Sequence, residues 1–263
     1  MKILVGNSKG GAGKSTTAVQ IIAPYLYEKF DKKIVTLIEF DDENKDSETF
    51  LGSSIIDTKQ IEIIGNDLSS EIIDAILEND NLIVDIGGNK TTTIILDELE
   101  NNGMFNAFDA FVIPLMDGEQ DSVNSIRIYK RVRELSSSIK IIFALSKVDK
   151  NMSLEMQFFD FFGDTKNRIN GAKGLIEQIH EDDRNIISIH SSDAIKYSRI
   201  FGNTVYEIAQ KDSSELKAEL SESMQNKNDD LSRKLSYKMG ILNTAKKYLA
   251  NTIIPCFNTL DKE

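Results

Sequence analysis

The chain has 263 residues, a formal net charge of −11 at pH 7, and a composition that is 40% hydrophobic and 28% charged. This balance indicates one large α/β domain, or one domain with a helical appendage, and argues against a disordered chain. A single cysteine, Cys256, excludes an intramolecular disulfide, and with only two histidines a zinc site is not expected. No apolar run approaches the length of a membrane span, and the short N-terminal one lacks the form of a signal peptide.

The first expected strand, residues 3–5, leads into a glycine-rich segment and then into an expected helix at about 14–29. A strand, a glycine-rich turn and a helix in this order form a loop whose backbone N–H groups point at bound phosphate. The expected phosphate-contacting residues are Lys9, Gly10, Gly11, Ala12, Gly13, Lys14, Ser15 and Thr16. We expect Lys14 to reach the outer phosphates and Ser15 to place its hydroxyl on Mg²⁺.

The rest of the chain alternates between short apolar strands and amphipathic helices. Strands are expected at 33–38, 60–64, 82–84, 110–114, 140–145 and 185–189, and helices at 69–78 and 119–135. This order predicts an α/β fold, a doubly wound and mostly parallel sheet with helices on both faces and ligands at the carboxyl ends of the strands. Residues 213–250 read as wholly helical. We therefore expect a P-loop domain over 1–210 and a C-terminal helical extension over 211–263, packed on or next to it.

One acidic residue closes an apolar strand in the pattern of a magnesium-holding aspartate. The segment is Leu82-Ile83-Val84-Asp85, and it predicts that Asp85 lies at the strand end facing the phosphates. Gly87 and Gly88 follow, and we expect their N–H groups to be available to sense the γ-phosphate.

The segment from Lys9 to Ser15 resembles the Lys-Gly-Gly-x-Gly-Lys-[Ser/Thr] loop of the deviant-Walker ATPases, which include the ParA partition proteins and MinD. The resemblance implies that ATP with Mg²⁺ brings two subunits together and that Lys9 acts in trans on the phosphates of the partner subunit. It also implies a weak ATPase that a partner protein stimulates. Two further segments, residues 191–197 and 201–207, are similar to the family region that flanks the base of the bound nucleotide.

The resemblance also gives a candidate for hydrolysis. Relatives have Asp-x-Asp-Pro-Gln where this chain has Glu39-Phe40-Asp41-Asp42-Glu43, so Asp41 matches the acid that orients the attacking water. Two alternatives stay open, namely Asp42 in that role, or an acidic loop with no catalytic part. Residues 146–149, Ser-Lys-Val-Asp, are also similar to the guanine-reading motif of GTPases, although the loop favours ATP.

The C-terminal extension carries a basic stripe on an otherwise acidic protein. Residues 1–210 hold 22 basic and 34 acidic side chains, whereas residues 211–263 hold 9 and 8. The candidate DNA-binding residues are Arg233, Lys234, Lys238, Lys246 and Lys247. Leu235, Met239, Leu242 and Leu249 form an apolar face, so the helix is also expected to pack on the body or on a partner subunit. A membrane-surface helix over 248–257 is a further alternative, although Pro255 and nearby acids argue against it.

These observations together predict a cytoplasmic ParA-like ATPase, associated with the nucleoid when ATP is bound, that drives plasmid or chromosome partition. Its partners would be a second copy, non-specific DNA and a DNA-bound adaptor that stimulates hydrolysis, with no stable membrane insertion. A switch that positions a protein cargo, such as a conjugation or cell-pole complex, without binding DNA is the main alternative. A metabolic ATP-dependent ligase or reductase partner on the same fold is a third.

Overall fold

A computed structural model describes residues 1–40, 46–60, 70–88, 90–164 and 171–262. Seven parallel strands form one sheet in the order β3-β2-β4-β1-β5-β6-β7. The strands are β1 (Lys2–Gly6), β2 (Val35–Phe40), β3 (Ile56–Gln60), β4 (Leu82–Ile86), β5 (Ala110–Leu115), β6 (Lys140–Val148) and β7 (Asn185–His190). The strand order reverses direction at β1, so the loop after β1 opens at the position where doubly wound sheets bind ligands. The predicted fold class is confirmed.

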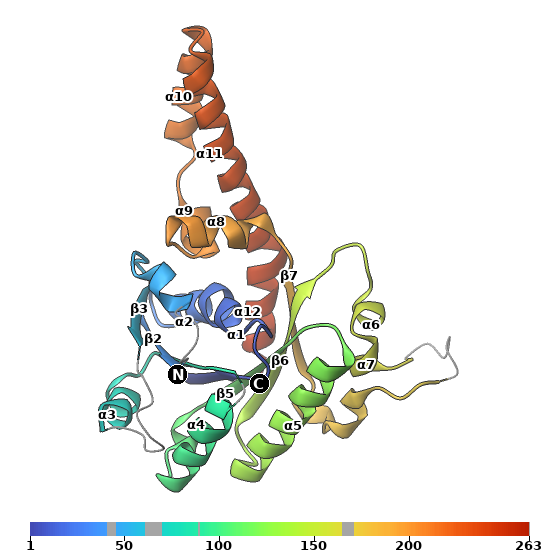
Figure 1. Ribbon diagram of the computed structural model, residues 1–263. Coiled ribbons are helices and arrows are strands. Elements are labelled where there is room, and N and C mark those ends of the chain that lie inside the picture. The colour runs from blue at the N-terminus through green and yellow to red at the C-terminus, as the bar shows by residue number, and fades with distance from the viewer. Residues whose placement is uncertain (41–45, 61–69, 89, 165–170, 263) are drawn as a thin grey trace.

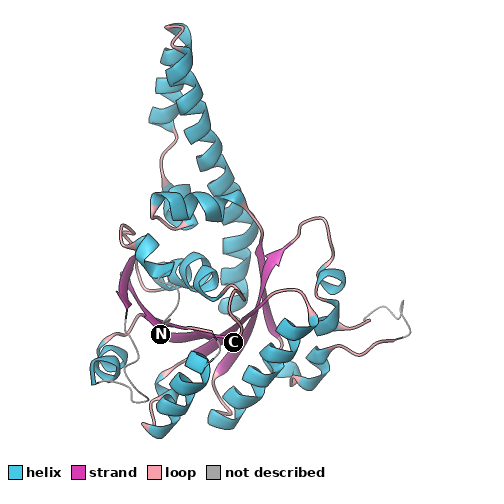
Figure 2. Cartoon of the chain, in the orientation of Figure 1, coloured by secondary structure: helices cyan, strands magenta, loops and turns pink. Residues whose placement is uncertain are grey.

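Helices cover both faces of the sheet (Figures 1 and 2). The first helix runs from α1 (Lys14–Thr17) through a π-helical turn (Ala18–Ile22) into α2 (Ala23–Lys29). The longer helices that follow are α3 (Ser70–Glu78), α4 (Lys90–Asn101), α5 (Glu119–Leu135), α8 (Asp193–Phe201), α9 (Val205–Gln210), α10 (Ser214–Gln225), α11 (Asp229–Tyr248) and α12 (Ile254–Leu260). Shorter elements are α6 (Leu154–Gln157), α7 (Phe159–Phe162), η2 (Asp46–Phe50), η3 (Phe105–Ala107), η4 (Leu175–Gln178), η5 (Glu181–Asp183) and η6 (Leu249–Ile253).

The sheet separates two hydrophobic cores because side chains alternate along each strand. Ile3 and Val5 of β1 face the core beneath α1, α2, α9 and the end of α11, whereas Leu4 faces the core beneath α4 and α5. These three side chains are fully buried. Since burying one such side chain stabilises the fold by about 1.5–3 kcal/mol, the β1 register, and with it the position of the glycine-rich loop, is strongly fixed.

The expected elements agree with the observed ones except in two places. A strand was expected at 60–64, whereas β3 spans Ile56–Gln60 and begins where Ile56 pairs with Val35 of β2; residues 61–64 lie outside the described part of the chain. The continuous helix expected over 213–250 is also interrupted. Residues 226–228 form a turn with Lys227 at φ 52°, and the Asn228 side chain accepts a hydrogen bond from the Leu231 N–H, which starts a new helix.

The C-terminal region forms an antiparallel helical hairpin that stands away from the sheet (Figure 1). We call α10 together with α11 up to Gly240 the arm. Beyond the arm, α11 passes α9 and α8 and leads through η6 into α12, which packs against β7. Tyr248, Ile253 and Cys256 are buried in the core of that face, so the segment considered as a membrane-surface helix is a packed part of the body. Within the described residues, no helix is both long and apolar enough to cross a membrane.

A half-buried carboxylate holds α9 to the loop that precedes β3. Glu207 completes a capping box with Thr204, and its other oxygen accepts hydrogen bonds from the Ser54 N–H and hydroxyl. Burial alone would raise the pKa of Glu207, but these backbone and hydroxyl donors outweigh it and hold the pKa below its ordinary value.

Candidate functional site

The glycine-rich loop adopts the backbone conformation that its glycines predict. Gly11 and Gly13 have φ values of 77° and 93°, a region that side-chain-bearing residues rarely occupy. A Cβ atom on Gly13 would lie 2.4 Å from the Ser146 hydroxyl oxygen, so this position also requires glycine sterically. Gly13 caps α1 without any side-chain hydrogen bond, which leaves the first-turn N–H groups of α1 to face a bound anion.

Lys14 lies inside this loop. Its side chain is largely buried, and its Nζ donates to the Lys9 carbonyl oxygen at 3.2 Å across the turn. Thr17 secures the start of the helix, because its hydroxyl and its N–H both donate to the Gly13 carbonyl, at 2.8 Å and 2.9 Å. The loop is therefore a preformed cradle with one cation at its centre.

Two polar residues that the sequence analysis did not single out hold this cradle in place. Asn7 is fully buried; its amide donates to the Pro114 carbonyl of β5 at 2.6 Å, and its carbonyl oxygen accepts from the Lys9 N–H at 3.2 Å. The buried Thr92 hydroxyl of α4 contacts the main-chain carbonyls of Asn7 and Gly87, at 3.2 Å and 2.7 Å. The loop is thus connected both to β5 and to the segment after β4. An asparagine that directly follows an apolar strand is the sequence signal from which the role of Asn7 could have been inferred.

Asp85 lies where the strand pattern placed it. It is buried in β4 and pairs in register with Val5 of β1, at the same sheet edge as the loop. The segment after it differs from expectation, because the Gly87 N–H donates to the Phe40 carbonyl at 2.5 Å and is not directed at the loop. Gly88 makes the close approach instead: a Cβ atom there would lie 3.0 Å from the Gly10 nitrogen and 3.4 Å from the Lys14 Nζ.

Lys9 forms an ion pair within its own chain. Its Nζ contacts a carboxylate oxygen of Asp121, in the first turn of α5, and the Asp121 side chain is only 3% exposed while that of Lys9 is 41% exposed. The second oxygen of Asp121 has no hydrogen-bond partner among the described residues. Asp121 was not identified from the sequence, since nothing there links it to residue 9.

A cavity of about 770 Å³ opens beside the loop, on the side of β6 and β7. Its lining includes Gly13, Thr16, Ser146, Lys147, His190, Ser191, Ser192, Asp193, Ile195, Lys196 and Arg199. This is the place of the expected base site, and the family-like patch at 191–197 contributes much of it. Burial, together with the charge of Lys150, lowers the pKa of His190, so its imidazole is neutral at pH 7.

The same cavity bears on the choice between adenine and guanine. Asp149, the residue that would read guanine, does not line the cavity; its carboxylate accepts hydrogen bonds from the Asn151 N–H and amide at 2.8 Å and 3.0 Å. This aspartate is engaged in its own turn, so the structure gives no support to the GTPase alternative.

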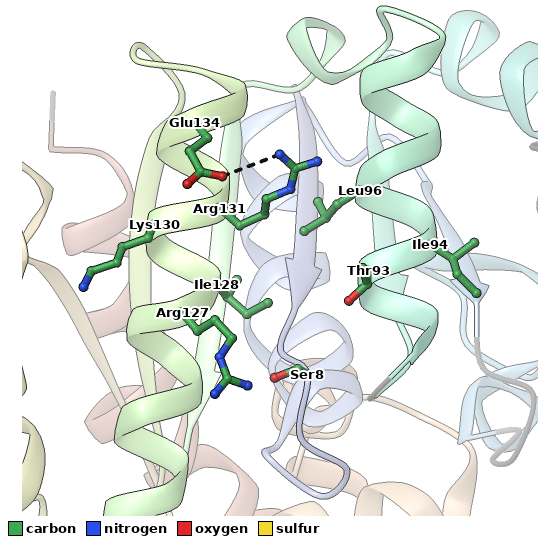
Figure 3. A pocket seen from close by; sticks show the side chains of 9 residues that line it. All are labelled: Ser8, Thr93, Ile94, Leu96, Arg127, Ile128, Lys130, Arg131 and Glu134. Atoms are coloured by element: carbon green, nitrogen blue, oxygen red, sulfur yellow. Dashed lines mark ion pairs between the residues drawn. The ribbon is translucent and has the colours of Figure 1, made fainter.

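A second cavity of about 680 Å³ lies between α4 and α5, with Ser8 of the loop at one end (Figure 3). Its lining includes three members of a second basic cluster of the sequence, which consists of Arg127, Lys130, Arg131 and Arg133 on α5. Most of these cations make contacts within the protein. Arg131 pairs with Asp97, Glu100 and Glu134, and Arg133 pairs with Asp183 at 2.5 Å. Lys130 donates to the Gln178 side chain. These contacts join α5 to its neighbours and leave Arg127 as an exposed cation of the cluster with neither an ion pair nor a side-chain hydrogen bond among the described residues.

The five candidate DNA-binding residues are all exposed on α11, namely Arg233, Lys234, Lys238, Lys246 and Lys247. The first three lie on the arm, and the last two lie where α11 meets the body. Asp41 and Asp42 fall outside the described residues, so the structure places neither of them. Among the described residues, no group of three or more histidine, cysteine, aspartate or glutamate side chains is arranged to hold a metal ion by itself.

The sheet order, the glycine-rich loop and the acid-ended β4 define a P-loop nucleotide-binding protein of the doubly wound class. A family model described as ATPase MipZ matches residues 1–127, which include the loop, Asp85 and the start of α5. This match covers just under half of the chain and agrees with the resemblance of its loop to the ParA/MinD-type ATPases.

Solved structures with a similar fold were also found. A putative plasmid partition protein of Borrelia burgdorferi B31, bound to AMPPNP, is 14% identical, with a TM-score of 0.47 over 74% of this chain and 88% of that one. The ATP complex of a Cyanothece McdA variant is 14% identical, with a TM-score of 0.45 over 92% and 96%. No curated protein matched the chain. At this distance the structural similarities carry no residue assignments.

Proposed function

We propose that this ATPase partitions DNA: it dimerises when it binds ATP, holds DNA non-specifically as a dimer, and releases it after hydrolysis. One observation supports the proposal: the chain combines a phosphate loop that has two lysines with a basic helix, α11, whose N-terminal half extends away from the acidic region formed by residues 1–210. In this scheme Lys14 serves the phosphates of its own subunit. Lys9 leaves Asp121 and serves those of the partner subunit.

The residues at the loop fit a magnesium–nucleotide complex. Ser15, in the first turn of α1, and Asp85, at the adjacent strand end, offer the hydroxyl and carboxylate oxygens that Mg²⁺ prefers. When bound, Mg²⁺ neutralises phosphate charge and favours transfer of the γ-phosphoryl group. Backbone N–H groups from Gly10 to Thr16 hold and orient the phosphates. Because Gly88 lies close to Gly10, the segment after β4 is near the phosphates and responds to loss of the γ-phosphate.

Hydrolysis is assigned to Asp41 on the resemblance alone. A carboxylate there would accept a proton from the attacking water or orient it. We propose that turnover is slow until a DNA-bound adaptor stimulates it, because a partition cycle needs the DNA-bound dimer to persist until the adaptor arrives.

The arm is the proposed DNA contact because most of the rest of the molecule repels phosphate. Non-specific binding requires cations near the DNA backbone, and residues 1–210 carry an excess of acids. Placing the basic residues on α11, a 20-residue helix about 30 Å long, moves several of them away from that acidic surface. Dimerisation doubles the set, so weak contacts become effective together, and the dimer becomes nucleoid-associated.

Two measurements test this proposal. Light scattering with ADP, with ATP, and with ATP on an Asp41→Ala variant should show a dimer that requires ATP and persists in the variant. Retention of a DNA duplex at low salt should rise with ATP. A monomer under every condition, or retention that ignores ATP, would contradict the proposal.

The salt dependence of DNA binding separates this function from its main alternative, a switch that positions a protein cargo. Each phosphate contact contributes about −0.9 to the slope of log affinity against log salt concentration. Replacing Lys234 by Gln should therefore flatten the slope of a dimer by about 2. The acidic body favours the cargo alternative, and that alternative predicts no measurable DNA binding and hence no slope to change.

A further inference from the structure

Two tyrosines meet where the arm joins the body. Tyr237 of α11 and Tyr197 of α8 have ring centroids 6.1 Å apart and ring planes at 84°, an edge-to-face contact. Figure 1 shows α8 beside α11 at this level. Tyr237 nevertheless stays 61% exposed. A tyrosine that served only to fasten the arm would bury its ring, so most of the Tyr237 ring is left for contact with something else.

Gly240 leaves open space next to this ring. It lies three residues after Tyr237 and therefore neighbours it on the helix surface. A glycine inside a helix is destabilising relative to alanine. No packing requirement explains that cost, because a Cβ atom on Gly240 would meet nothing within 4 Å and the residue has no left-handed φ. The missing side chain allows a flat group to approach Tyr237 closely.

Exposed cations lie beside the ring on α11. Arg233 and Lys234 lie four and three residues before Tyr237, on the same face of the helix. Neither Arg233 nor Lys234 makes an ion pair within 4 Å in the part of the chain that the structure describes.

The acidic residues of α8 and α11 that lie nearest to these cations are in the first turns of the two helices. Asp229 and Asp230 stand in the first turn of α11, and Asp193 stands in the first turn of α8. Carboxylates stabilise helices at these N-terminal positions. The surface around Tyr237 thus combines an accessible aromatic face, an open space and positive charge.

We propose that this surface binds single-stranded nucleic acid, with a base stacked on Tyr237 and the flanking phosphates held by Arg233 and Lys234. Aromatic rings beside cations suit single strands, whose bases offer free faces, whereas the bases of a duplex are stacked on one another. The inference rests on the proposed nucleic-acid contact of the arm and specifies its form.

Fluorescence anisotropy of the full chain with labelled (dT)20, with a 20-base-pair duplex and with (rU)20, each with ATP and with ADP, tests the proposal. We expect (dT)20 to bind more tightly than the duplex. Tyr237→Ala should weaken (dT)20 binding about 5- to 100-fold, the range for loss of one stacked base, and leave duplex binding within about 2-fold. Tyr237→Phe should retain binding, because the ring does the stacking. The tighter of (dT)20 and (rU)20 identifies the natural strand.

A second substitution separates stacking from folding of the arm. Gly240→Leu adds a helix-favouring side chain that fills the open space, so it should stabilise the arm while weakening (dT)20 binding about 10-fold. Ala218→Leu, on the exposed surface of α10, is the matched control and should change neither the stability of the arm nor the binding of (dT)20.

The outcomes distinguish this inference from the proposed function. Duplex binding that equals or exceeds binding of (dT)20, or Tyr237→Ala and Gly240→Leu variants that bind (dT)20 like the wild type, overturns the stacking surface and leaves duplex-based partition standing. If neither strand nor duplex binds with ATP, both proposals fall.

Discussion

The ion pair between Lys9 and Asp121 predicts an asymmetry between the two substitutions that remove it. Lys9→Ala leaves the Asp121 carboxylate, only 3% exposed, without its cation. Leaving a buried charge without its partner lowers the free energy of unfolding by about 3–5 kcal/mol. The partial positive charge at the N-terminal end of α5 stabilises the carboxylate and offsets part of this loss, so we expect a loss of about 3 kcal/mol. Asp121→Asn leaves no buried charge without a partner, because the Lys9 side chain is 41% exposed and is hydrated by water instead. The expected loss of unfolding free energy is therefore about 1 kcal/mol or less.

Urea unfolding at pH 7 without nucleotide measures this asymmetry. The double variant Lys9→Ala, Asp121→Asn should unfold within about 1 kcal/mol of the wild type, since the buried charge and its cation are removed together. Equal losses for the two single variants, or a double variant as unstable as Lys9→Ala, would refute the reasoning.

The same variants test the proposed role of Lys9 in the partner's site. If Lys9 must leave Asp121 to act in trans, then Asp121→Asn removes that cost of about 1 kcal/mol and should tighten the ATP-dependent dimer about 5-fold. The double variant keeps the fold but lacks the lysine, so it should not dimerise with ATP. Sedimentation with ATP and with ADP reads out both results.

Four further substitutions have outcomes that follow from their surroundings. Gly13→Ala should abolish nucleotide binding, measured by calorimetry, because the φ of Gly13 is 93° and the new Cβ atom would lie 2.4 Å from the Ser146 hydroxyl oxygen. Gly10→Ala is the control: its new Cβ atom meets nothing within 4 Å, so this variant should bind nucleotide. Glu207→Gln should destabilise the protein by about 1–3 kcal/mol at pH 7. Because the folded state lowers the pKa of Glu207, its contribution is present above about pH 4.5 and is lost as the pH falls through the folded value, so the variant and wild-type stabilities should converge in acid. Leu235→Ala should cost about 2–5 kcal/mol locally and raise hydrogen exchange in the arm, with nucleotide binding unchanged, because Leu235 is buried against α10 far from the loop.

The main features of the nucleotide site were readable in the sequence because they depend on local geometry. A run of glycines between a strand and a helix leaves few conformations for the backbone, and Gly11 and Gly13 adopt the ones expected. An acid that closes a buried strand must emerge at the carboxyl edge of a parallel sheet, so Asp85 was found as well. The helix at 119–135 was predicted with its observed bounds, since its apolar positions repeat with a helical period.

Contacts between distant segments were not predictable. Asp121 lies 112 residues from Lys9, and only the packing of α5 beside the loop makes them partners. Asn7 and Thr92 hold the loop through carbonyl groups whose positions depend on the sheet order. The expectation for Gly87 failed for the same reason, because its N–H is used by the main chain of β2.

The sequence by itself determined the doubly wound fold, the phosphate loop and the basic stripe of the C-terminal region, since each depends on residue types a few positions apart. Only the tertiary structure decided that the helical region folds back at Lys227 into an arm, that Tyr197 meets Tyr237 at its base, and that Arg131 and Arg133 of the earlier basic cluster pair with acids of neighbouring elements. Those outcomes depend on which surfaces pack together, and packing is selected by the free energy of the whole chain and not by any short segment of it.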